Sequence, residues 1–313
     1  MYGSLISRSR ERLDEDAPRD QQIESIVDTK RSKLRPSFVK PSSAVLALIL
    51  FASAGFMLAQ NPNNAIKDTR YLALGDSIPF GFNPTVPVSL SNYHGYPEFV
   101  SDGIHRKVAN ASCFGETSGS FLSLNEPDLG CHAWKAAGNP LFISYSGTQM
   151  DYAVNYLLNN PNPEFVTINI GGNDLGLLQV ECNFDLKCEF TKLPTVLGTY
   201  GQNILTIFTN LRVKAGYQGP IVLLTYYVFN YNDPVQVGAF TQLNGIASGI
   251  ATAFGAKIAD GFTAFMVAST PFGGDSCAAG LLVKLPDGTC DTHPSLAGQK
   301  LLASTVLQVA AVK

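Results

Sequence analysis

The chain has 313 residues, of which 45% are hydrophobic and only 15% are charged. This length is enough to bury a large core, in one domain or two. The formal net charge of -3 excludes the strongly basic field that nucleic-acid binding requires, so we expect no nucleic-acid partner.

The first 60 residues differ in composition from the rest of the chain. Residues 1–43 are polar and charged with little apolar periodicity, which predicts a disordered tail. Residues 44–59 form an apolar run without charge, and basic residues precede it. Such a run is typical of a signal peptide or a single membrane anchor, which we expect within residues 44–60. Both alternatives place the rest of the chain outside the cytoplasm, secreted or anchored to a membrane.

Apolar strands alternate with helices from residue 68 to residue 313. Strands are expected near 72–74, 107–113, 164–170, 219–229 and 256–262, and helices near 146–161, 195–214, 235–254 and 296–312. This alternation indicates parallel βαβ units, and strands that are apolar throughout are buried on both faces. We therefore predict one α/β/α sandwich over residues 68–313.

Polar clusters follow three of these expected strands, at the point where each strand ends. They are "GDS" at 75–77, "CFGETSG" at 113–119 and "GGND" at 171–174. The carboxyl ends of parallel strands meet at one edge of a sheet, so we expect the three clusters to lie together. A fourth cluster, "CDTHPS" at 290–295, precedes the closing helix in what we expect to be a loop.

These clusters contain the parts of a serine hydrolase site. A serine nucleophile needs a base within hydrogen-bond reach and donors for the oxyanion that forms. Among the four histidines, His293 is the best base, because it precedes Pro294 in a segment that leads into the last helix. The expected oxyanion donors are the backbone N–H groups of Ser77 and Gly115 and the side-chain amide of Asn173.

The six cysteines form an even set in a chain with an export signal, which suggests disulfide bonds. Fifteen complete pairings are possible for six cysteines. The spacing suggests three local loops, Cys113–Cys131, Cys182–Cys188 and Cys277–Cys290. A zinc site is the competing interpretation, and the absence of CxxC or CxxH spacing disfavours it.

In their order, the segments Gly75-Asp76-Ser77, Gly115, Gly171-Gly172-Asn173-Asp174 and His293-Pro294 resemble the four blocks of the SGNH (GDSL) hydrolase superfamily. The likeness spans about residues 70–300, and "CFGETS" with the cysteines resembles the secreted, disulfide-bearing lipases and esterases most closely. The resemblance implies a flavodoxin-like three-layer α/β/α fold with a mostly parallel five-stranded sheet. It also implies hydrolysis of an ester substrate without a metal or other cofactor, and we expect a monomer.

The resemblance also implies roles for single residues: Ser77 as nucleophile, His293 as base, and Ser77, Gly115 and Asn173 as oxyanion donors. The family usually has Asp three residues before the His, but position 290 is Cys and Asp291 lies two residues before. The Asp291 carboxylate and the backbone carbonyl of Cys290 therefore compete for Nδ1 of His293. We favour the carbonyl, which gives a Ser–His dyad, and keep Asp291 as the alternative third member.

Other functions fit these residues less well. An α/β-hydrolase needs a G-x-S-x-G turn, which Ser77 lacks because position 79 is Pro. A glycosidase with two carboxylates would use Asp76 and Asp174. A non-catalytic member that binds glycans or lipids is the alternative from another class, and the presence of all the site residues together argues against it. The acyl chain, the alcohol and the choice between hydrolysis and acyl transfer stay open.

Overall fold

The structure, a computed structural model, describes residues 67–160 and 163–310 of the chain. The expected polar tail at 1–43 and the expected signal peptide or anchor at 44–60 lie outside the described residues. Among the residues that are described, none of the helices combines the length and apolar character needed to cross a membrane.

Five parallel strands form the central sheet, in the spatial order β2-β1-β3-β4-β5. This is the strand order of the flavodoxin-like doubly wound fold. The prediction of a five-stranded sheet in a three-layer fold is therefore confirmed. The strands are β1 (Lys67–Gly75), β2 (Arg106–Asn110), β3 (Val166–Asn169), β4 (Ile221–Leu224) and β5 (Lys257–Ala259).

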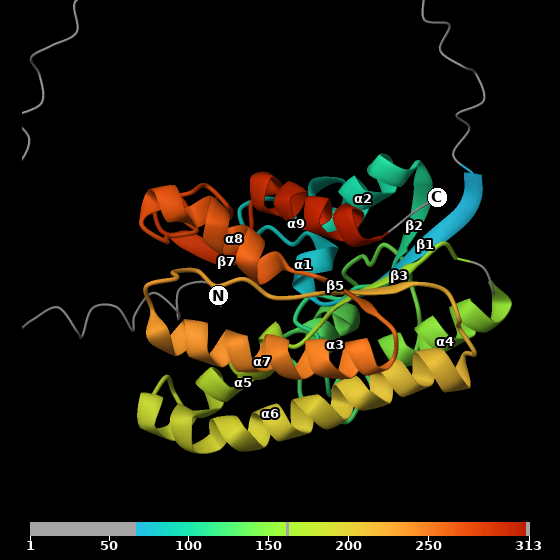
Figure 1. The fold of residues 1–313 in the computed structure, drawn as a ribbon, viewed down its shortest axis with the longest axis horizontal. Helices are drawn as coiled ribbons and strands as arrows, with labels where there is room; N and C mark the ends of the chain where they lie inside the picture. Colours follow the sequence, from blue (N-terminus) through green and yellow to red (C-terminus); the bar gives the residue numbers. More distant parts are fainter. Residues whose placement is uncertain (1–66, 161–162, 311–313) are drawn as a thin grey trace, which may run out of the picture.

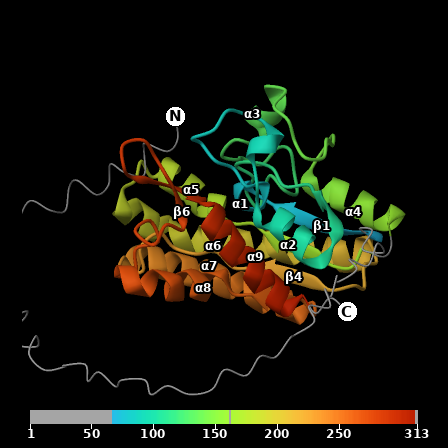
Figure 2. The ribbon, with the colours of Figure 1, turned by 90° about the horizontal axis from the view of Figure 1, so that it is seen from above.

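Helices cover both faces of the sheet (Figure 1). One face carries α2, α8 and α9, which lie side by side in Figure 2, and the other carries α4, α6 and α7. The helices are α1 (Ser77–Phe80), α2 (Tyr96–Ile104), α3 (Cys131–Ala136), α4 (Gln149–Asn159), α5 (Gly172–Glu181), α6 (Leu186–Thr209), α7 (Pro234–Ala253), α8 (Gly261–Ser269) and α9 (Leu296–Val309). Three further short helical turns are η2 (Leu90–Asn92), η3 (Asn210–Lys214) and η4 (Thr270–Phe272).

The central strands are apolar because both of their faces are covered. All four residues of β3 and all four of β4 are buried, and residues 71–74 of β1 are 0% exposed. The carboxyl end of β1 is Gly75, which has a φ of 140°. A Cβ at this position would lie 2.0 Å from the carbonyl oxygen of Asn169, so only glycine fits where β1 ends beside β3.

Helices α2, α3, α5 and α8 were not expected from the sequence, and two other segments differ from their expected bounds or type. Helix α6 begins at Leu186, earlier than the expected residue 195, because the Asp185 side chain accepts a hydrogen bond from the Cys188 N–H and caps the helix. The segment expected as a loop at 290–295 contains a strand, β7 (Cys290–Pro294), which pairs antiparallel with β6 (Leu282–Lys284). This pairing between segments was not visible in the short polar cluster itself.

Candidate active site

Ser77 lies directly after the carboxyl end of β1, at the first residue of α1, and is 5% exposed. The preceding Asp76 caps this helix, since its Oδ1 accepts a hydrogen bond of 2.9 Å from the Ile78 N–H. Gly81 ends the helix in the left-handed conformation, with a φ of 71°. The backbone N–H of Ser77 has no hydrogen-bond partner among the described residues.

Two buried glutamines hold the residues on either side of Ser77. On α4, Gln149 accepts from the Gly75 N–H at 2.6 Å and donates to the Gly75 carbonyl at 2.9 Å. On α9, Gln299 donates to the Ile78 carbonyl at 3.0 Å and accepts from the first backbone N–H of α2 at 2.8 Å. The turn that carries Ser77 is thus fixed from both helical layers. Neither glutamine could be expected from the sequence, because no local pattern marks them.

The loop after β2 brings Gly115 to the same edge of the sheet. Gly115 has a φ of 75°, and its N–H donates no hydrogen bond within residues 67–160 and 163–310. The Cys113 N–H donates to the Gly75 carbonyl at 3.1 Å, which holds the loop beside the end of β1. The Asn173 side-chain amide donates to the Glu116 carbonyl at 2.8 Å and keeps its second hydrogen free. The three polar clusters that we expect at one edge of the sheet therefore lie together.

The two carboxyl groups that a glycosidase would need are both engaged in structural hydrogen bonds. Asp76 accepts from the Tyr226 hydroxyl with the oxygen that does not cap α1. Asp174 accepts from the Ser118 N–H at 2.9 Å and from the Ser118 hydroxyl at 2.5 Å. Burial raises the pKa of Asp76 to about 7 and that of Asp174 to about 6. These groups position the loops around Ser77, which disfavours a two-carboxylate mechanism.

His293 lies on β7, and its Nδ1 contacts the Asp291 carboxylate. The expected contact with the Cys290 carbonyl is therefore wrong for this structure. The reason is local: Oδ1 of Asp291 also accepts the His293 backbone N–H at 3.0 Å, a turn that an Asp commonly makes two residues before an N–H. Burial disfavours the charged form of Asp291, but the hydrogen bond and charge of His293 outweigh it and lower the Asp291 pKa below its usual value.

The structure brings His293 to the side of the Ser77 turn without joining the two side chains. Strand β7 contacts α1, and the Phe82 ring centroid lies 4.9 Å from the imidazole centroid. The Phe82 N–H in turn donates to the Ser77 carbonyl at 3.1 Å. Among the described residues, no hydrogen bond links the Ser77 hydroxyl to the imidazole. Such bonds are often long in free enzymes and tighten when substrate binds.

The six cysteines form the three pairs that the spacing suggests: Cys113–Cys131, Cys182–Cys188 and Cys277–Cys290. The Cys113–Cys131 bond ties the Gly115 loop to α3. The Cys277–Cys290 bond ties the start of β7 to the segment after η4. Two of the three bonds thus brace segments that carry expected site residues.

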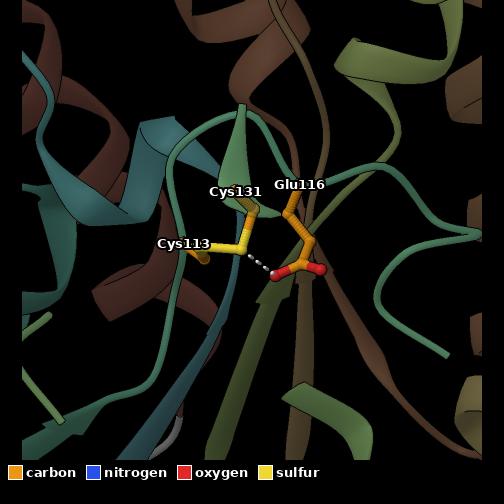
Figure 3. Close-up of side chains that lie close together, drawn as sticks. All are labelled: Cys113, Glu116 and Cys131. Carbon is orange, nitrogen blue, oxygen red and sulfur yellow. Dashed lines mark hydrogen bonds between the residues drawn. A yellow bond between two sulfur atoms is a disulfide. The ribbon is translucent and has the colours of Figure 1, made fainter. Parts of the chain in front are cut away.

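Figure 3 shows Glu116 beside the Cys113–Cys131 disulfide, the one grouping of possible metal ligands within the described part of the chain. A disulfide sulfur is no thiolate, so this grouping offers a metal only the carboxylate. Glu116 Oε2 lies 3.3 Å from Cys131 Sγ and 3.0 Å from Nε2 of Gln149. Burial raises the Glu116 pKa to about 7. We conclude that Glu116 supports Gln149, and through it Gly75.

The model of the GDSL-like lipase/acylhydrolase family matches residues 73–301. Among solved structures, a protein described as a GDSL-like lipase from Parabacteroides merdae ATCC 43184 is 16% identical, with a TM-score of 0.51. That match covers 79% of this chain and 97% of the other. Phospholipase A1 from Streptomyces albidoflavus NA297 is 19% identical, with a TM-score of 0.50, over 78% of this chain and 100% of the other. Likeness at these identities shows a shared fold. No curated protein sequence matches the chain.

Proposed function

This chain belongs to the GDSL-like lipase/acylhydrolase family and is a carboxylic ester hydrolase, and from this premise we propose that Ser77 is its nucleophile. His293 is the base and Asp291 the third member of the triad. The observation that carries this proposal is the contact of the Asp291 carboxylate with Nδ1 of His293 beside the turn that holds Ser77. A carboxylate there holds the imidazole in the tautomer that leaves Nε2 free to accept a proton.

The reaction follows from these positions. The Ser77 hydroxyl oxygen attacks the ester carbonyl carbon and passes its proton to Nε2 of His293. The oxyanion accepts hydrogen bonds from the Ser77 and Gly115 N–H groups and from the Asn173 amide. The imidazolium then protonates the leaving alcohol, and an acyl group remains on Ser77. A water molecule then gives a proton to Nε2 of His293 and attacks the acyl carbon, and the acid leaves as the imidazolium returns the proton to the Ser77 oxygen.

Two features support the oxyanion roles. The N–H groups of Ser77 and Gly115 have no partners among the described residues, and the Asn173 amide has one hydrogen to spare. A buried donor without a partner costs free energy, so sites that keep such donors commonly use them for a ligand. We also propose that the domain works outside the reducing cytoplasm, where its three disulfides persist.

The test uses the purified full chain, a fluorophosphonate probe and a chromogenic ester. We expect the probe to label Ser77 and the ester to be hydrolysed, and Ser77→Ala to abolish both. The matched control is Ser304→Ala on α9, whose hydroxyl bonds a carbonyl of its own helix at 2.7 Å and which should keep full activity. A folded wild-type protein that neither reacts nor turns over ester would refute the proposal and favour the non-catalytic binding function.

A further inference from the structure

Two aromatic rings lie against His293. The ring centroids of Phe82 and Phe114 are 4.9 Å and 6.3 Å from the imidazole centroid, and 4.3 Å from each other. Both residues are half-buried, so each remains partly accessible to solvent. We call Phe82 and Phe114 the aromatic wall. Phe114 directly precedes Gly115 in the chain, so the wall extends from a proposed oxyanion donor to the proposed base.

The aromatic wall is held from behind by Trp134 on α3. The Trp134 ring centroid lies 5.6 Å from that of Phe114 and 6.1 Å from that of Phe82. Its indole N–H donates to the Pro140 carbonyl at 3.0 Å, which fixes the ring. The Cys113–Cys131 disulfide joins the residue before Phe114 to the first residue of α3. The wall is therefore a built surface whose rings keep their places.

An apolar cluster continues from the wall. The hydrophobic side chains that pack, partly buried, on the small core of Phe80, Tyr93 and Trp134 are Phe82, Val86, Leu90, Phe114, Leu141 and Phe142. A sugar stacked on these rings would need polar partners for its hydroxyl groups, because buried polar groups without hydrogen bonds are costly. A hydrocarbon or aryl group needs none and gains from leaving water.

We propose that the aromatic wall binds an apolar group of the ester, which makes esters with a long alkyl or an aryl group the preferred substrates. This inference rests on the proposed function, in which His293 is the base. Nε2 must lie near both the attacking and the leaving oxygen, so any ester in position has its reacting carbon beside the wall. The apolar group belongs either to the acyl part or to the alcohol part, because both extend from that carbon.

The experiment measures kcat/KM for two ester series. One series lengthens the acyl chain of p-nitrophenyl esters from acetate to decanoate, and the other lengthens the alcohol of alkyl acetates from methyl to octyl. Burial of one methylene group corresponds to about a fourfold gain in kcat/KM. We expect such a rise along one series until the wall is covered. A rise with acyl length assigns the wall to the acyl group, and a rise with alcohol length assigns it to the leaving group.

Variants of the wall test whether these rings are responsible. Phe82→Ala and Phe114→Ala should each reduce the kcat/KM of the longest ester about tenfold more than that of the shortest, which flattens the rise. Phe82→Leu and Phe114→Leu keep an apolar surface and should retain most of the rise in kcat/KM with chain length. The control is Phe254→Ala, a half-buried ring between α7 and β5, at the opposite end of the sheet from Ser77. It should leave the rise unchanged.

The outcomes separate this inference from the proposed function. An active enzyme whose kcat/KM is flat along both series, or higher for acetylated sugars than for either, would overturn the role of the wall and leave the function intact. A rise that persists in the wall variants would also overturn it. A folded chain without ester turnover and without fluorophosphonate labelling would instead refute the proposed function.

Discussion

At the scale of single residues, Asp291 has a double contact with His293. One carboxylate oxygen meets both Nδ1 of the imidazole and the backbone N–H of the same residue. The second bond fixes the side chain, so the carboxylate does not have to be three residues before the histidine to reach it. Because the Asp291 pKa is lowered, its carboxylate stays ionised at more acidic pH than an ordinary aspartate does.

Asp291→Asn should keep the shape of this contact but remove its charge and favour the wrong tautomer of His293. We expect kcat to fall by about 10⁴, the size of the loss for the same change in the serine-protease triad, with little change in KM. Steady-state kinetics with a thermal melt measure both effects. The matched control is Asp287→Asn in the same β6–β7 hairpin, an exposed residue that should leave kcat unchanged. A loss below about tenfold would instead assign the orientation of His293 to a backbone group.

At the scale of elements, helices α4 and α9 each contribute one glutamine to the turn that carries Ser77. Gln149 and Gln299 are both 1% exposed, and each bonds backbone groups far away in the sequence. A helix that packs on a sheet can thus fix the end of a strand as well as bury an apolar face. This arrangement makes the position of Ser77 depend on the docking of both helical layers.

Gln149→Met and Gln299→Met should each leave one buried backbone N–H without a partner, that of Gly75 or of Tyr96. Each unpaired group costs about 1–3 kcal/mol, so we expect the free energy of unfolding to fall by that amount. We also expect kcat to fall more than KM rises, because the turn of Ser77 loses a support. Urea denaturation and steady-state kinetics test this. If neither variant differs from Gln242→Met, an exposed change on α7, the glutamines do not hold the turn.

At the scale of the whole molecule, four carboxyl groups that are buried or half-buried make folding depend on pH. Burial raises the pKa of Asp76, Glu98 and Glu116 to about 7 and that of Asp174 to about 6. In the unfolded chain such groups ionise near pH 4. Between about pH 4 and pH 7 the folded state therefore binds more protons, and the free energy of unfolding decreases as the pH rises.

We expect the Tm to be highest on the acidic side of this window and to fall by about 5 °C or more between pH 5 and pH 8. Glu116→Gln removes one of the four groups and should make this decline shallower. Glu126→Gln, at an exposed position, is the matched control and should not alter it. Thermal melts across this pH range measure the effect. A Tm that stays constant or rises toward pH 8 would contradict the assignment of these carboxyl groups.

The sequence by itself determined the fold class and the edge where the polar clusters meet. Alternating apolar strands and helices are local patterns that the sequence shows directly. The carboxyl ends of parallel strands share one edge of the sheet, so "GDS", "CFGETSG" and "GGND" could be placed together from the sequence alone. The three disulfide pairs followed from short spacings for the same reason. The signals for all of these lie within single segments of the chain.

Only the tertiary structure decided which groups meet at that edge. The position of the Asp291–His293 pair beside the Ser77 turn depends on how β7 packs against α1, and the support of Gly75 by Gln149 depends on how α4 packs on the sheet. The aromatic wall likewise joins residues of two separate loops to His293. Such contacts are between segments distant in the chain, and a polar or aromatic residue looks the same in sequence whether or not its partner is there. Packing of the helical layers on the sheet brings the partner into contact. The hydrogen bonds and ring contacts of the site residues can therefore be identified only in the folded chain.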